Sequence, residues 1–121
     1  MTPARSPSRG EIWLVNFDPT IGSEIQKTRP ALILQNDIAN QHSPVTIVAA
    51  LTSRFDNEMY PTEVHVPASE GGLSKDSTVL LNQLRTIDRQ RLVKRLGRLK
   101  SETMVQVAHA LTVSLGLVDL D

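Results

Sequence analysis

The sequence contains no cysteine. This absence excludes a disulfide framework, thiolate zinc sites, redox-active thiol pairs and a cysteine nucleophile. Long apolar runs are missing too, since stretches such as residues 47–51 (IVAAL) are far shorter than the ~20 residues of a membrane-spanning helix. The N-terminus lacks the apolar core of a signal peptide. We therefore expect a soluble cytoplasmic protein, with no membrane partner, that begins with a flexible tail over residues 1–8.

Metal-binding and nucleotide-binding motifs are also absent. His42, His65 and His109 are far apart in the sequence, and none has a second ligand at metal-binding spacing. Gly71-Gly72 lacks the context of a phosphate-binding loop and predicts only a turn. No nucleophile elbow of the GxSxG type occurs. The sequence therefore predicts no metal and no other cofactor.

The chain does contain enough apolar sequence for one folded domain, which we expect over residues 9–121. Its 121 residues are 40% hydrophobic and 21% charged, which is typical of a globular protein. Only the C-terminus predicts a helix, with Ser101 as its N-cap and Gly116 as its C-terminal cap. Short segments rich in β-branched residues predict strands over 11–17, 30–36, 45–53, 62–66 and 77–84, with one or two more within 85–99. With no helix between strands, the expected fold is mainly β with α, a small β-barrel or half-barrel with a C-terminal helix.

Charge is unevenly distributed along the chain. The sequence has 13 lysines and arginines and 13 aspartates and glutamates, so its formal net charge is zero. Residues 85–100, however, contain seven cations and one carboxylate, which leaves six cations and twelve carboxylates elsewhere. A basic segment of this kind favours phosphate binding, because attraction depends on local potential. It is equally typical of a charged strand edge that prevents aggregation, and charge alone does not separate the two interpretations.

Polar side chains gather where the expected strands end. Arg29 precedes one strand, Thr52 and Ser53 end another, and Gln83 and Arg85 share one face of a third. An arginine fork binds phosphate oxygens, a hydroxyl donates one more hydrogen bond, and an amide can contact base edges. Together they suit the binding and metal-free cleavage of a phosphodiester, although each residue alone has an ordinary structural explanation.

The order of several motifs resembles one known family. Residues 9–37 (RGEIWLVNFDPTIGSEIQKTRPALILQND) are similar to the opening of the MazF/PemK toxins, the endoribonucleases of bacterial type II toxin–antitoxin pairs. The similarity continues through VTIVAALTS at 45–53, GGLSKDSTVLLNQLRTIDRQRL at 71–92 and the C-terminal helix. It spans almost the whole chain beyond the tail.

The resemblance implies a fold, an activity and a set of site residues. It implies an SH3-like barrel of the CcdB/MazF type that cleaves single-stranded RNA at a short sequence, independently of the ribosome, and so arrests translation and growth. Arg29 and Thr52 correspond to the family's catalytic arginine and threonine. The remaining candidates would contact RNA, namely Ser23, Glu24, Lys27, Ser53, Gln83 and Arg85.

One departure from the family pattern bears on the mechanism. Some plasmid-borne members have a catalytic histidine in the loop and an aspartate before the glutamine, where this chain has Ser23 and Asn82. The resemblance is therefore to the chromosomal Gram-positive type, with an arginine and threonine scheme. In that scheme the ribose 2′-hydroxyl attacks the phosphorus while Arg29 stabilises the developing charge. The general base is left open between Arg29, the family's candidate, and Glu24.

Partners and alternatives follow from the same resemblance. The family implies a homodimer, a MazE-like antitoxin with an acidic disordered tail, and operator DNA bound indirectly through that antitoxin. One alternative is a CcdB-like gyrase-binding toxin; such toxins carry a tryptophan near the C-terminus, whereas the only tryptophan here is Trp13. The second alternative is a non-catalytic RNA-binding module.

Overall fold

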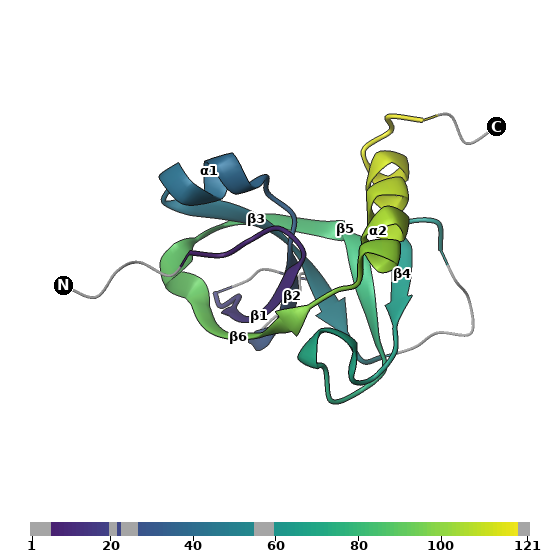
Figure 1. Cartoon of the computed structure of the whole chain (residues 1–121), viewed down its shortest axis with the longest axis horizontal. Coiled ribbons are helices and arrows are strands. Elements are labelled where there is room, and N and C mark those ends of the chain that lie inside the picture. The colour runs from purple at the N-terminus through teal and green to yellow at the C-terminus, as the bar shows by residue number, and fades with distance from the viewer. Residues whose placement is uncertain (1–5, 20–21, 23–26, 55–59, 119–121) are drawn as a thin grey trace.

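The computed structural model describes residues 6–19, 22, 27–54 and 60–118. In this part of the chain six strands form one antiparallel sheet in the order β4-β5-β3-β2-β1-β6. Figure 1 shows the sheet curling on itself, with α2 lying beside β4 and β5. The strands are β1 (Glu11–Asn16), β2 (Thr28–Ile33), β3 (Val45–Thr52), β4 (Glu63–Val66), β5 (Ser77–Asp88) and β6 (Leu92–Arg98). The helices are α1 (Asp37–His42), α2 (Ser101–Ser114) and the 3-10 turns η1 (Glu70–Gly72) and η2 (Arg89–Arg91).

The mainly β class with a C-terminal helix is confirmed, but several strand boundaries differ from expectation, most of all those of β2 and β5. The strand β2 ends at Ile33, three residues before the expected end at Asn36. The strand expected to end at residue 84 continues to Asp88, because its second half pairs with the first half of β3. The strand expected to begin at Pro30 begins two residues earlier at Thr28, since residues 28–32 pair with β1. Pro30 is therefore inside a strand that has neighbours on both sides.

The expectation that no helix lies between strands was wrong. The helix α1 follows β2, and its N-cap Asn36 accepts a hydrogen bond from the Ala39 N–H at 2.8 Å. Its one buried residue is Asn40, whose Oδ1 accepts from the hydroxyl of Thr46 at 2.8 Å. A six-residue helix held by amides is too short to show an apolar periodicity, so the sequence pattern contained no signal for it.

The C-terminal helix α2 is confirmed, with a different N-terminus. Lys100, rather than Ser101, is the N-cap, and no side chain of its own caps the helix. Instead the Glu70 carboxylate, distant in sequence, accepts from the Lys100 N–H at 3.1 Å and the Thr103 hydroxyl at 2.7 Å. A carboxylate at this end of a helix is favourable because it opposes the helix dipole. Gly116 ends the helix as expected, with a φ of +71°.

Two apolar clusters lie on opposite faces of the sheet, as strand alternation requires. One cluster contains Ile12 and Leu32 of the sheet together with Val107 of α2. The other contains Trp13, Phe17 and their neighbours on the opposite face. Residues 6–8, which the sequence places in the tail, also contact the domain: Pro7 is buried and the Ser8 N–H donates to Glu11 at 2.8 Å.

Three glycines, Gly71, Gly72 and Gly97, allow the turn η1 to pack closely against the edge strand β6. The edge strands β4 and β6 do not pair with each other in the described part of the chain, and η1 packs against β6. A Cβ atom on Gly72 would be 2.0 Å from the Leu96 carbonyl oxygen, and one on Gly97 would be 2.5 Å from the Gly71 carbonyl carbon. The contact is therefore backbone against backbone, which only glycine permits.

The close contact at Gly72 predicts that adding a methyl group there lowers the stability of the fold. Gly72→Ala forces the η1 backbone away from β6, and we expect it to lower the free energy of unfolding by ~3 kcal/mol, the sum of overpacking and a left-handed φ. Gly116→Ala is the matched control, because its φ of +71° is close to the +76° of Gly72 but a Cβ there would meet nothing within 4 Å beyond its own chain neighbours. It should cost ~1 kcal/mol. Urea unfolding measures both, and equal losses would contradict the close contact.

Candidate functional site

A hollow opens where β2 and β3 separate. The pairing between these strands covers residues 31–33 and 48–50 and stops at Ala31. Pro30 has no N–H with which to extend that ladder. On its other edge β3 pairs with β5 along its whole length, with Leu51 opposite Val79 and Thr52 opposite Thr78 at this end. Strands β2 and β3 diverge here, and a hollow of about 470 Å³ lies beside their unpaired ends.

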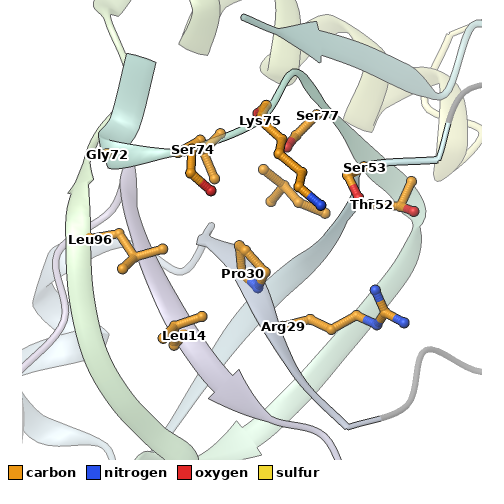
Figure 2. Close-up of a pocket in the computed structure, with 12 residues that line it drawn as sticks. Leu14, Arg29, Pro30, Thr52, Ser53, Gly72, Ser74, Lys75, Ser77 and Leu96 are labelled. Carbon is orange, nitrogen blue, oxygen red and sulfur yellow. The ribbon is translucent and has the colours of Figure 1, made fainter. Parts of the chain in front are cut away.

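The hollow has an apolar floor and a polar rim (Figure 2). Strands β1, β2, β3, β5 and β6, the turn η1 and the segment that follows η1 all contribute to it. The apolar floor consists of Leu14, Pro30, Leu51, Leu73 and Leu96. The polar rim consists of Arg29, Thr52, Ser53, Ser74 and Lys75, with Gly72 beside them. The buried Ser77 also lines the hollow, and its hydroxyl donates to the Lys75 carbonyl oxygen at 3.0 Å.

Arg29 and Thr52, the two expected catalytic residues, line this hollow together. Arg29 is half-buried near the start of β2, where it pairs with Val15 of β1. Thr52 is the last residue of β3, and its Oγ1 accepts a hydrogen bond from the Arg54 N–H at 3.1 Å. Because that bond uses an oxygen lone pair, the Thr52 O–H can donate to a ligand. Figure 2 shows the guanidinium and the hydroxyl on the same side of the hollow.

Lys75 is a lining residue that the sequence analysis did not identify. It precedes β5, and Figure 2 shows its ammonium group projecting into the hollow opposite Arg29. The sequence showed Gly71-Gly72 only as a turn, whereas the packing of that turn against β6 carries the next residues to the rim. A cation a few residues after a glycine pair is too common a pattern to have indicated this position.

The other expected RNA-binding residues divide into three groups. Ser53 lines the hollow, whereas Lys27 and Gln83 do not. Arg85 is directed elsewhere: its Nη1 donates to the Phe17 carbonyl oxygen at 2.7 Å, and its guanidinium lies 5.8 Å from the centre of the Phe17 ring. Ser23 and Glu24 lie outside the described residues. Of the candidates, the structure therefore brings Arg29, Thr52 and Ser53 together.

Much of the basic segment at residues 85–100 binds the protein itself. Arg89 donates to the Ser43 carbonyl oxygen at 3.2 Å, and Arg91 to that of Asn16 at 2.9 Å. Arg95 forms an ion pair of 2.7 Å with Glu11, whose side chain is largely buried. The cluster of arginines in the sequence is thus chiefly structural, and the cations that line the hollow are Arg29 and Lys75.

Two further findings concern the described part of the chain. No three histidine, aspartate or glutamate side chains come together there as ligands for a metal ion. None of its helices is long and apolar enough to cross a membrane.

The lining of the hollow brings two cations and several hydroxyls together above an apolar floor, and such groups can donate to phosphate oxygens. The described fold is a single curled antiparallel sheet with a C-terminal helix, and the hollow lies at one end of its strands β2 and β3. Residues 8–115 match the family model described as the PemK-like, MazF-like toxin of type II toxin–antitoxin systems. The chain therefore belongs to the PemK/MazF toxin family.

Individual relatives agree with this assignment. The chain is 43% identical over 111 residues to the endoribonuclease EndoA of Bacillus subtilis, covering 92% of this chain and 96% of that protein. The structure of MazF from Deinococcus radiodurans superposes with a TM-score of 0.79 at 30% identity, covering 93% and 98% of the two chains. A mycobacterial endoribonuclease in complex with its cognate antitoxin gives 0.77 at 25% identity, with the same coverage. The gyrase-binding alternative is not favoured by these similarities.

Proposed function

We propose that this protein is the toxin of a type II toxin–antitoxin pair, an endoribonuclease that cleaves single-stranded RNA in the cytoplasm without a metal ion. The observation that supports it most strongly is the meeting of Arg29 and Thr52 in one hollow, although they come from different strands. Membership of a family whose members include a named endoribonuclease supports the same activity.

The reaction we propose is an intramolecular transfer. The ribose 2′-hydroxyl loses its proton and its oxygen forms a bond to the adjacent phosphorus, while the bond from phosphorus to the 5′-oxygen breaks and that oxygen gains a proton. The products are a 2′,3′-cyclic phosphate and a 5′-hydroxyl. DNA lacks the nucleophile, so it can bind but cannot react.

The residues of the hollow have distinct roles in this reaction. Arg29 donates to the non-bridging oxygens, which become more negative in the transition state. Thr52 donates to the same phosphate and fixes its orientation for in-line attack. Lys75 adds a second positive charge, and Ser53 extends the polar rim. The cations supply the charge stabilisation that a metal ion provides in other nucleases.

Partners follow from the family. We propose a homodimer that is inhibited by a MazE-like antitoxin, through which the toxin also associates with operator DNA. The mycobacterial relative has been solved with its cognate antitoxin, which supports such a partner here. An acidic tail would be attracted by Arg29 and Lys75, the same charges that attract RNA.

Substitution of the two central residues tests their assignment. Arg29→Ala and Thr52→Ala should each reduce the cleavage rate ~100-fold or more, as removal of a transition-state donor does, and should weaken RNA binding much less. Arg29→Lys should also be defective, because an ammonium cannot form the bidentate fork. Lys94→Ala, which removes an exposed cation of β6, is the control and should cleave normally. Normal cleavage by Arg29→Ala would refute the assignment.

Metal dependence and product chemistry provide a second test. Cleavage of a long mRNA should proceed in excess EDTA and leave 2′,3′-cyclic phosphate ends, which mass spectrometry of the fragments would detect. An oligonucleotide with a single 2′-deoxy sugar at the cut position should bind and stay intact. Loss of activity in EDTA with recovery in magnesium would show that the reaction is a different one.

Inhibition by an antitoxin gives a third prediction. The acidic antitoxin should compete with RNA for the hollow, and its inhibition should weaken as salt rises, because part of the attraction is electrostatic. Steady-state cleavage at several RNA and antitoxin concentrations measures this, and light scattering gives the mass of the free toxin. Inhibition that leaves RNA binding unchanged would contradict competition, and an active monomer would contradict the dimer.

A further inference from the structure

We infer that Arg85 and Arg91 are positioning residues, which fix the backbone that carries Arg29 instead of binding RNA themselves. This inference rests on the proposed function, because it concerns the geometry of the same site. It also changes the role expected for Arg85, which the sequence placed among the RNA-binding residues.

The two guanidinium groups bind consecutive backbone carbonyls at the end of β1. Arg85 donates to the oxygen of Phe17 at 2.7 Å, and Arg91 donates to those of Asn16 at 2.9 Å and Asp18 at 2.5 Å. Arg85 also lies over the ring of Phe17, a residue only 2% exposed. We call this set of contacts the carbonyl clamp.

The clamp connects directly to the strand that contains Arg29. The Phe17 N–H donates to the Lys27 carbonyl oxygen at 3.0 Å, and the Lys27 N–H donates to Asp18 Oδ1 at 2.8 Å. The ladder then continues with Asn16 opposite Thr28 and Val15 opposite Arg29. Arg29 therefore lies two residues from Lys27, whose backbone groups are hydrogen-bonded to Phe17 and Asp18.

Arginine suits this task for physical reasons. Hydrogen bonds from a charged donor are about twice as strong as those between neutral groups, and a guanidinium presents several N–H groups in a fixed plane. Both arginines are half-buried and come from β5 and η2, which are far along the chain from β1. They hold one end of the β1–β2 hairpin against the body of the sheet.

Salt dependence separates a clamp from a phosphate contact. Each phosphate that a protein neutralises on a single strand adds ~0.7 to the slope of log affinity against log salt. Arg85→Gln would lower this slope by ~0.7 if Arg85 bound RNA, and would leave it unchanged if the side chain acts through Phe17. Lys94→Gln is the control for removing one positive charge from an exposed position.

The experiment compares Arg85→Gln, Arg91→Gln and Lys94→Gln in the full-length protein, using a single-stranded RNA that the wild type cuts. We expect the kcat of both arginine variants to fall ~10-fold or more, because Arg29 is displaced. We expect little change in KM, because the positive charges that line the hollow remain. The salt slope should equal that of the wild type. Without any RNA, amide hydrogen exchange at Phe17 and Lys27 should rise in both variants and not in the control.

The outcomes are distinguishable. A slope lowered by ~0.7 would show that Arg85 contacts phosphate and would overturn the inference. Unchanged exchange at Phe17 and Lys27, or a loss of rate that only follows a loss of folded protein, would overturn it as well. If the wild type does not cleave RNA at all, the proposed function is wrong, and the exchange measurement still decides whether the clamp exists. Arg85→Lys should recover part of the protection, since an ammonium can donate to one carbonyl.

Discussion

The backbone contact between η1 and β6 is the constraint on which the rest of the structure depends. Because Gly72 and Gly97 have no side chains, the turn lies directly against the edge strand and joins the two ends of the curled sheet. The same turn provides Glu70, whose carboxylate holds the start of α2. It also carries Lys75 to the rim of the hollow. Loss of this contact would therefore affect the fold, the helix and the site together.

The cationic side chains fall into two sets that differ in what they contact. The arginines of the basic segment donate to carbonyl oxygens or to the largely buried Glu11, and so stabilise turns and strand ends. Arg29 and Lys75 line an open hollow whose floor is apolar. A site of this kind can keep its charge oriented before a substrate arrives, which is the condition for stabilising a transition state without reorganisation. The formal net charge of zero does not indicate which cations bind the protein itself and which line the hollow.

The sequence alone determined the fold class and the order of most elements. Alternating and β-branched segments indicated the strands, and Gly116 marked the end of α2, because these signals depend on neighbours within a few residues. Motif order also identified the family and singled out Arg29 and Thr52. Local signals failed at α1, a six-residue helix capped by the Asn36 side chain. They also failed at Lys100, where α2 is capped by a carboxylate thirty residues away.

Only the tertiary structure decided which polar residues meet. Arg29, Thr52 and Lys75 line one hollow because β2 and β3 diverge at Pro30 and because η1 packs on β6, and neither event is encoded by spacing along the chain. The same holds for Arg85, whose partner Phe17 lies 68 residues away. A sequence pattern gives the chemical type of a side chain and the face of its strand. The group that it binds is determined by how distant segments pack, since hydrogen bonds and charges act only over a few ångströms.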